Sequence, residues 1–313
     1  MSDCTAGACN LLLAIDKPSG CTSHDVVLRC RRALGQRRVG HAGTLDPLAS
    51  GVMIIGAGQA TRLLGMLTLD VKCYVAEISF GCETNTDDIE GEVTRAAAVP
   101  RDLVDLSGAQ RVLDGFLGSG EQIPPAFSAI SVNGVRSYRV ARSGGEIDLP
   151  PRPVTIYRAD ALAAFERAGS LMWTVVFEVS KGTYIRALAR DIGRAAGSAA
   201  HVSALRRTAS GSIRLDSCVE MDGLDRSIAR ESCLDPIRAL GIAAVDIPAR
   251  YREDILCGRR VPISAAGDLS RLPRSGDRVA CVRRGELLAL ARRRGDDLVM
   301  DTVFPEVIEG VRI

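Results

Sequence analysis

The sequence predicts an α+β fold, in which a mixed or antiparallel sheet is followed by a small β-rich module. The chain has 313 residues, 46% of them hydrophobic and 25% charged, which suits one large domain and a small one. Strand-like segments occur in runs with helices between them, without the regular strand–helix alternation of a doubly wound parallel sheet. Past about residue 245, short strand-like segments are separated by glycine turns. We therefore expect one domain at 1–245 and a second at 246–313.

The N-terminal part of the chain contains three segments with clear strand patterns. Residues 11–15 and 51–56 are continuous apolar runs, which are typical of buried strands. Residues 71–80 alternate as a half-exposed strand does. Thr22 or Ser23 is expected to cap the helix that follows the first strand. Other helices are expected at 59–67, at 107–117 with Ser107 as its cap, and at 183–196; other strands are expected at 154–165, 171–180, 201–215, 261–263, 277–283, 286–291 and 298–303.

Composition argues against a membrane protein, a disulfide scaffold and a zinc protein. Mean hydropathy is +0.10, and no apolar run is long enough for a membrane span. The apolar run at 11–15 is also too short for the core of a signal peptide, so we expect a cytoplasmic protein. The ten cysteines are scattered without a Cys-x-x-Cys pair, and none of the three histidines has zinc-ligand spacing from them. We expect no metal site.

Basic residues show an unusual bias toward arginine. Only three of the 40 are lysine, namely Lys17, Lys72 and Lys181. Because lysine and arginine differ in shape and hydration, these lysines indicate positions where a guanidinium does not fit. Several arginine pairs and triplets are present although the net charge is only +2. Each cluster alone is typical of a solvated face, but together they are compatible with binding to phosphates.

One carboxylate has a setting that favours a functional role. Asp46 lies in the glycine-rich segment 40–51, Gly-His-Ala-Gly-Thr-Leu-Asp-Pro-Leu-Ala-Ser-Gly. Pro47 biases Asp46 toward an extended backbone. Gly40, Gly43 and Gly51 relax the backbone on either side of it. An acid that must meet a substrate at a fixed angle needs such a loop, whereas a solvated acid does not.

A second segment, 179–186, contains residues that could act with this acid. Arg186 could pair with a carboxylate and orient it, and Tyr184 could face the same cleft. A surface arginine and a core tyrosine are the structural alternatives. Tyr74, on the strand at 71–80, either packs in the core or stacks on a base. An ionised and oriented aspartate can serve as a nucleophile.

Two other kinds of functional site, a dinucleotide-binding site and a glycosidase site, do not fit the sequence. The segment 56–61 begins Gly-x-Gly after a strand, but Thr61 stands at the third glycine of a dinucleotide site and the βαβ context is missing. A glycosidase needs two carboxylates that flank one bond, and only Asp46 has a persuasive setting.

Five segments resemble the bacterial tRNA pseudouridine synthases of the TruB type. Their order and spacing agree over roughly residues 11–215, and the C-terminal module is similar to a PUA-type RNA-binding domain. Two positions depart from the family pattern, since Ala42 stands where threonine is frequent and Ser131 where lysine is expected. The five segments are Leu13–Ser23, Gly40–Gly51, Pro124–Ala129, Ser180–Arg186 and His201–Thr208.

This resemblance implies that the chain isomerises uridine to pseudouridine at position 55, in the T loop of tRNA. The bond to be broken is hidden in a folded loop, so the uridine must be flipped out of it. No cofactor is implied. The residue roles that the resemblance implies are Asp46 as the essential aspartate, Arg186 as its ion-pair partner, Tyr74 as the residue that stacks on the uracil, His41, Tyr184 and Leu205 as the lining of the nucleotide pocket, and Lys17 as the support of the catalytic loop.

Two other functions are compatible with the same fold. One is an RNA-binding or RNA-folding protein without activity, although the presence of Asp46, Arg186 and Tyr74 together favours catalysis. The other is an enzyme that acts on a different RNA. Guide-RNA-dependent members of the superfamily are of this kind, and they need partner proteins. The motifs of this chain are those of stand-alone bacterial enzymes, so we expect the T stem-loop of tRNA as its substrate, no obligatory protein partner, and a monomer.

Overall fold

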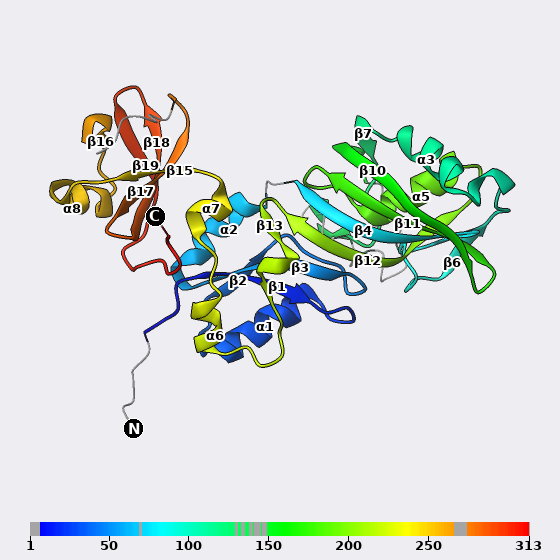
Figure 1. The fold of residues 1–313 in the computed structure, drawn as a ribbon, viewed down its shortest axis with the longest axis horizontal. Helices are drawn as coiled ribbons and strands as arrows, with labels where there is room; N and C mark the ends of the chain where they lie inside the picture. The colour runs from blue at the N-terminus through cyan, green and yellow to red at the C-terminus, as the bar shows by residue number, and fades with distance from the viewer. Residues whose placement is uncertain are drawn as a thin grey trace. The chain divides into compact units, whose positions relative to one another are not determined.

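The computed structural model describes residues 7–68, 71–128, 131–132, 135–137, 140, 145, 149–265 and 274–312. The chain separates into two compact units, each of which is drawn in Figure 1. The first contains Met1–Pro47, Gly51–Leu69 and Gly211–Ile313, and the second contains Leu48–Ser50 and Asp70–Ser210. We describe each unit by itself.

The first unit has its N-terminal core on strand β1, Leu12–Lys17, which pairs antiparallel with β3, Ser50–Ala57. Strand β14, Cys218–Val219, pairs parallel with β1, and β2, Val39–Ala42, pairs antiparallel with β3. Both β1 and β3 are almost entirely buried, as their apolar runs predict. The sheet is therefore mixed, which confirms the expected fold class.

Helix α1, Ser23–Leu34, follows β1 and is amphipathic. Thr22 is its N-cap, because the Thr22 side chain accepts a hydrogen bond from the Asp25 N–H and the Asp25 carboxylate accepts one from the Thr22 N–H. This reciprocal arrangement is a capping box. Gly35 ends the helix in the left-handed conformation that glycine adopts readily. Of the two residues expected as caps, Thr22 is the one that caps the helix.

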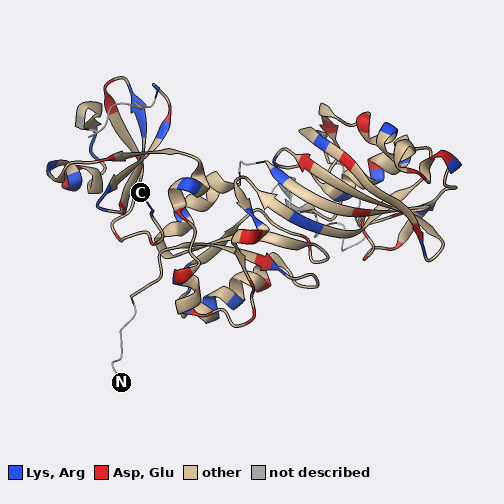
Figure 2. Ribbon diagram, viewed as in Figure 1, with Lys and Arg blue, Asp and Glu red and all other residues tan. Residues whose placement is uncertain are grey.

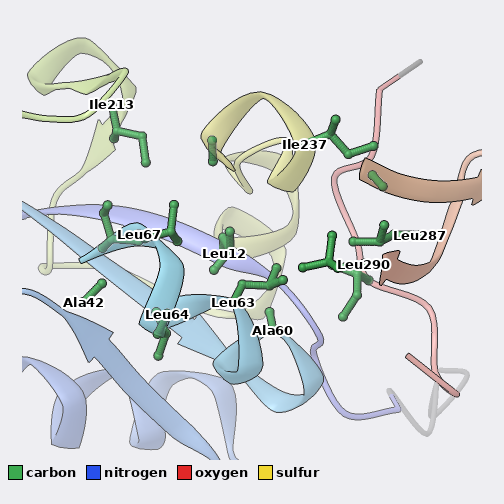
Figure 3. Close-up of a cluster of buried hydrophobic side chains, with 14 of the residues drawn as sticks. Leu12, Ala42, Ala60, Leu63, Leu64, Leu67, Ile213, Ile237, Leu287 and Leu290 are labelled. Atoms are coloured by element: carbon green, nitrogen blue, oxygen red, sulfur yellow. The ribbon is translucent and has the colours of Figure 1, made fainter. Parts of the chain in front are cut away.

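A five-stranded sheet completes the first unit, in the order β15-β17-β18-β19-β16. Alternate residues of β17 face opposite sides of this sheet. Val279 and Cys281 pack in a core within the C-terminal module, while Ala280 and Val282 pack in a cluster with Leu12 and other residues near the N-terminus (Figure 3). The predicted boundary at residue 245 falls within β15, and the division into domains 1–245 and 246–313 stays a prediction. The strands are β15 (Ala243–Asp246), β16 (Val261–Pro262), β17 (Arg278–Arg283), β18 (Glu286–Arg294) and β19 (Asp297–Val303).

The second unit contains five strands that lie side by side in the order β12-β4-β11-β10-β7, all antiparallel to their neighbours. One face of this sheet is apolar and buried, because residues such as Ile78 and Trp173 point to it. The Trp173 indole donates a hydrogen bond to the Leu103 carbonyl on that side. The strands are β4 (Lys72–Phe80), β7 (Gly118–Gln122), β10 (Arg152–Arg167), β11 (Ser170–Val179) and β12 (Ala200–Ser210).

Helices α3, Leu106–Asp114, and α5, Ile185–Ala195, cover this unit's sheet on one side (Figure 1). The cap of α3 is Asp105, whose carboxylate accepts a hydrogen bond from the Gly108 N–H, so the expected cap at Ser107 was wrong. The expected helix at 59–67 is a 3₁₀ helix that continues into one short α-turn. The remaining elements are α2 (Leu64–Leu67), α6 (Arg226–Glu231), α7 (Pro236–Leu240), α8 (Arg252–Leu256), β5 (Cys82–Thr84), β6 (Val93–Ala96), β8 (Ser131–Val132), β9 (Val135–Arg136), β13 (Ile213–Arg214) and the 3₁₀ helices η1 (Gly58–Leu63), η2 (Arg101–Leu103), η3 (Leu215–Ser217), η4 (Ala249–Tyr251) and η5 (Ile263–Ala265).

Basic and acidic residues are interspersed along the ribbon of both units (Figure 2). In the C-terminal sheet, for example, Arg278 and Arg292 both pair with Asp301, at 3.2 and 2.9 Å. Local acids therefore neutralise part of the charge of the arginine clusters. None of the described helices has the length and apolar character required to cross a membrane.

Candidate active site

Asp46 is half-buried in the segment that joins β2 to β3, and hydrogen bonds fix the backbone on both sides of it. On one side, the Ser23 hydroxyl accepts a hydrogen bond from the Leu45 N–H and donates one to the Leu45 carbonyl, both at 2.9 Å. On the other side, the Gly20 N–H donates to the Pro47 carbonyl at 2.8 Å. The turn after β1 and the start of α1 therefore hold the Asp46 backbone in place.

Lys17 adds a third support to the same segment. Its side chain is fully buried at the end of β1, and its ammonium group donates to the carbonyls of Pro18, Cys21 and Pro47 at 2.8, 2.7 and 3.3 Å. A compact ammonium with three donors can serve three convergent carbonyls, whereas a planar guanidinium cannot. This geometry accounts for a lysine at this position in a chain that otherwise uses arginine.

Two glycines of the segment have backbone conformations that other residues adopt at a cost. Gly43 has φ +75° and Gly51 has φ +105°. Gly43 directly follows β2 and Gly51 is the second residue of β3, so these conformations occur on both sides of Asp46. His41 is half-buried on β2, opposite Ile55 of β3 in the strand register. Ala42, which departs from the family pattern, is buried on the same strand. The side chain of Ser131, the second departure, lies outside the described residues.

In the second unit, Tyr184 is the residue before α5 and is half-buried. The Gln122 amide binds its backbone twice: Gln122 Oε1 accepts from the Tyr184 N–H at 2.9 Å, and Gln122 Nε2 donates to the Tyr184 carbonyl at 3.1 Å. Gln122 is itself 4% exposed. A buried side chain of β7 therefore sets the direction in which α5 begins.

Arg186, in the first turn of α5, is buried among acceptors. Its guanidinium donates to the carbonyls of Thr86 and Phe127 at 2.7 and 3.0 Å, and it pairs with the Asp88 carboxylate at 3.5 Å. The side chains of Arg186 and Asp88 are 4% and 5% exposed. Fully desolvated pairs of this kind are costly to break, because removal of one partner leaves a buried charge.

The same face of α5 presents two more arginines to the acidic segment Glu83–Glu92. Arg190 pairs with Asp87 at 2.8 Å, and Arg194 binds both oxygens of Glu83 at 3.0 and 2.6 Å. Since Arg186, Arg190 and Arg194 are spaced by four residues, they lie along one side of the helix. The N-terminal half of the acidic segment, from Glu83 to Asp88, is thereby attached to α5.

The surroundings of two carboxyl groups in this segment shift their pKa values in opposite directions. The guanidinium of Arg194, assisted by that of Arg95, holds the pKa of Glu83 below its ordinary value of 4.5. Burial raises the pKa of Asp87 to about 6, although Arg190 and Arg186 oppose this shift. The opposite signs follow from the strength of hydrogen bonding at Glu83 and the depth of burial at Asp87.

Tyr74 and Leu205 lie on the buried face of the second unit's sheet. In the strand register Tyr74 is opposite Arg207 and Leu205 is opposite Ala76, and side chains two apart on a strand share a face. Tyr74 and Leu205 are 8% and 7% exposed, and Arg207 is 1% exposed. Tyr74 is therefore close to a buried cation on the face that α5 covers.

The site residues expected from the sequence thus fall into two groups. Asp46, Lys17 and His41 belong to the first unit. Tyr74, Tyr184, Arg186 and Leu205 belong to the second. Lys17 is in direct contact with the Asp46 segment. The ion pair expected between Arg186 and Asp46 stays a prediction; the contacts described for Arg186 are those to Asp88, Thr86 and Phe127.

Three residues of this geometry were missed by sequence reasoning. Ser23 was considered only as a helix cap, and neither Asp88 nor Gln122 was singled out. The signal for Ser23 was the presence of two capping residues in a row, of which a helix needs one. In the part of the chain that the structure describes, no cluster of histidine, cysteine, aspartate or glutamate could hold a metal ion. The expectation that the chain needs neither metal nor cofactor stays a prediction.

Comparison with protein families gives two adjoining matches. Residues 31–185 match the model of the "TruB family pseudouridylate synthase (N terminal domain)". Residues 186–240 match that of the "tRNA pseudouridylate synthase B C-terminal domain".

Curated relatives cover almost the whole chain. A protein of Mycobacterium tuberculosis named tRNA pseudouridine synthase B is 42% identical over 284 residues, which are 91% of this chain and 92% of the relative. Proteins of the same name from Nocardia farcinica and Cutibacterium acnes are 40% and 39% identical over 289 and 282 residues. They cover 91% and 90% of this chain, and 94% and 92% of their own lengths.

Solved structures share the fold. A chain in the "Structure of H/ACA RNP bound to a substrate RNA containing 2'-deoxyuridine" matches 95% of this chain and 85% of its own length, with a TM-score of 0.69 and 24% identity. A chain in the archaeal box H/ACA sRNP Nop10–Cbf5 complex matches 94% of this chain and 86% of its own, with a TM-score of 0.67 and 23% identity. At this level of identity the likeness concerns the fold alone.

Proposed function

Because this chain belongs to the TruB family of pseudouridylate synthases, we propose that it isomerises uridine 55 in the T loop of tRNA to pseudouridine, with Asp46 as the catalytic carboxylate. The family and the names of its relatives support a tRNA uridine isomerase. The position in tRNA and the role of Asp46 rest on the resemblance of the segment 40–51 to the family motif. The structural observation that supports this role is the anchoring of the backbone on both sides of Asp46 by hydrogen bonds.

The reaction makes specific demands on one carboxylate. The bond between uracil N1 and ribose C1′ breaks, the base turns, and a bond from C5 to C1′ forms while the C5 proton is lost and N1 gains one. Atoms and electrons balance without an oxidant, a reductant or water. Asp46 either attacks C1′ and holds the sugar covalently, or stabilises the positive charge that develops on the ribose. Both roles need an ionised carboxylate at a fixed angle, and the anchored peptides of Leu45 and Pro47 suit that need.

The substrate must present its uridine outside the folded T loop. Flipping a nucleotide out costs a few kcal/mol, and stacking of a base on an aromatic side chain returns about 1–3 kcal/mol. In our proposal Tyr74 stacks on the everted uracil, while His41, Tyr184 and Leu205 line the nucleotide pocket. Arg186 orients and neutralises the Asp46 carboxylate. Lys17 supports the backbone of the catalytic loop.

The working form of the enzyme follows from the same assignment. We propose that the chain acts on free tRNA as a monomer in the cytoplasm, without a guide RNA, a protein partner or a cofactor. The arginine clusters of the sequence, although local acids neutralise part of their charge, are suited to contacts with the phosphates of the T stem. The C-terminal module, 246–313, is proposed to add RNA contacts of this kind.

The test uses the purified full-length chain and an unmodified tRNA transcript, with no other protein or RNA present. Pseudouridine is then mapped by carbodiimide modification and primer extension. The proposal predicts a single pseudouridine, at position 55, and none in a matched transcript with cytidine at that position. Binding of the transcript without any pseudouridine would instead favour the non-catalytic RNA-binding alternative, and pseudouridine at a different position would refute the assigned target.

A further inference from the structure

The hydroxyl of Ser23 has no part in capping α1, although it lies at the start of that helix. Thr22 supplies both the side-chain acceptor and the backbone donor of the capping box with Asp25. The Ser23 hydroxyl instead forms two hydrogen bonds with Leu45, which is 22 residues away in the chain. Thr22 therefore caps the helix, whereas its neighbour Ser23 binds the backbone of Leu45.

These two hydrogen bonds act on the peptide group that leads into Asp46. The Leu45 carbonyl and the Asp46 nitrogen belong to one planar unit, so a donor that fixes the carbonyl fixes the plane from which Asp46 departs. The Leu45 N–H is fixed by the same oxygen. On the far side, the Gly20 N–H and Lys17 ammonium hold the Pro47 carbonyl. One side chain, that of Ser23, therefore holds both the N–H and the carbonyl of Leu45.

Burial makes this link stiff. Ser23 and Leu45 are each 4% exposed, so water cannot readily replace either hydrogen bond. Ser23 is also the first residue of a twelve-residue helix, and side chains that project from regular elements hold a site more firmly than side chains on loops.

We infer that Ser23 is a positioning residue for the isomerisation: it sets the angle at which the Asp46 carboxylate meets the uridine. This inference rests on the proposed function of Asp46. Displacement of a reacting group by about 1 Å lowers a rate by about 100-fold, while substrate binding by other residues is unaffected. Loss of the hydroxyl should therefore lower kcat and leave KM and tRNA affinity unchanged.

The experiment compares three variants of the full-length enzyme with the wild type. S23A removes both hydrogen bonds, and S23C keeps the branching of the side chain but replaces the hydroxyl by a somewhat larger thiol that is a weak donor and acceptor. T22A is the matched control, because it removes the cap of the same helix and no bond to Leu45. Each variant is assayed for kcat and KM on tRNA by tritium release from C5 of uridine, for tRNA affinity by filter binding, and for thermal unfolding.

We expect kcat to fall by about 10- to 100-fold for S23A and by a smaller factor for S23C, with KM and tRNA affinity within twofold of the wild type. T22A should lower the unfolding temperature but keep kcat within twofold at a temperature where it is folded. Wild-type kcat in S23C or in folded S23A would overturn the inference, and so would an equal loss of kcat in folded T22A. D46N, assayed in parallel, separates this result from the parent proposal: an active D46N contradicts the role of Asp46, whereas an inactive D46N beside an active S23A contradicts only the role of Ser23.

Discussion

Gln122 and Tyr184 exchange two hydrogen bonds, at 2.9 and 3.1 Å, between a buried side-chain amide and both backbone groups of the residue that begins α5. The residue two positions later is Arg186, whose guanidinium donates to the Thr86 and Phe127 carbonyls and pairs with the Asp88 carboxylate. One amide on β7 thus sets the start of the helix that presents both Tyr184 and Arg186. A small error in the direction of this helix would move both side chains together.

Replacement of Gln122 by leucine should therefore lower activity as well as stability. Q122L removes both hydrogen bonds between the Gln122 amide and the Tyr184 backbone, whereas the Tyr184 carbonyl keeps the hydrogen bond from the Leu188 N–H. Loss of a typical hydrogen bond lowers stability by about 0.5–1.5 kcal/mol. Gln110 offers a matched control, since its amide makes two equivalent hydrogen bonds, to the Ala159 carbonyl and the Ala161 N–H of β10. Urea unfolding and kcat are measured for both variants. Q110L should lose stability and keep its kcat; an equal loss of kcat in both variants would show that Gln122 only stabilises the fold.

Arg186 should not be replaceable by lysine. R186K keeps the positive charge, but a single ammonium cannot reproduce the fork that reaches two carbonyls and the Asp88 carboxylate. We expect kcat to fall by at least about tenfold, in keeping with the loss of one or more charge-assisted hydrogen bonds at about 1.5–3 kcal/mol each. R194K is the control, because Arg194 is 55% exposed and lies two turns farther along α5. Comparable kcat values in R186K and the wild type would remove Arg186 from the catalytic assignment.

Replacement of Lys17 and of Lys181 by arginine tests why lysine occurs at these positions in a chain rich in arginine. Lys17 is fully buried and its ammonium serves three carbonyls, whereas Lys181 is exposed. K17R forces a larger, planar group into a packed site and should destabilise the fold by about 1–3 kcal/mol. K181R should change stability by no more than about 0.5 kcal/mol. The free energy of unfolding of each variant is measured by urea titration. Equal stability of K17R and K181R would mean that the guanidinium fits at position 17.

The acid sensitivity of the fold should depend partly on Glu83. Its pKa in the folded chain is held below the ordinary value of 4.5, chiefly by hydrogen bonds from Arg194. A carboxyl with a lowered pKa contributes stability that is fully present above its unfolded pKa and is lost as the pH falls through the folded pKa. E83Q should therefore differ most from the wild type in unfolding temperature at pH 5–7, and the two curves should converge at lower pH. E92Q, at an exposed residue of the same segment, should follow the wild type throughout; parallel curves for E83Q and the wild type would contradict this linkage.

Local patterns predicted the strands well and the contacts between distant segments poorly. The alternation of residues 71–80 matched β4 closely, because a sheet with one buried face imposes a period of two. The helix expected at 59–67 begins as a 3₁₀ helix, and the strand expected at 201–215 ends at Ser210, before Gly211. Such ends depend on packing and on glycine geometry that periodicity does not encode.

The candidate site was predictable where one segment contains the signal. Asp46 was chosen from the glycines and the proline around it. The scarcity of lysine marked Lys17 only together with Lys72 and Lys181, and the family resemblance assigned its role. Pairing between Arg186 and Asp88 was not predictable, because nearly 100 residues separate the two and either charge could have been solvated. The same holds for Ser23 and Leu45, whose hydrogen bonds depend on how the start of α1 packs beside the segment between β2 and β3.

The most direct test of the central claim is the comparison of D46N with the wild type on the same unmodified tRNA transcript. Asparagine keeps the shape of the side chain but cannot act as an anionic nucleophile or stabilise positive charge on the ribose. We predict that D46N binds the transcript with an affinity within a few-fold of the wild type and forms no pseudouridine at position 55 in prolonged incubation. Pseudouridine formation by D46N at a substantial fraction of the wild-type rate would contradict the role assigned to this carboxylate.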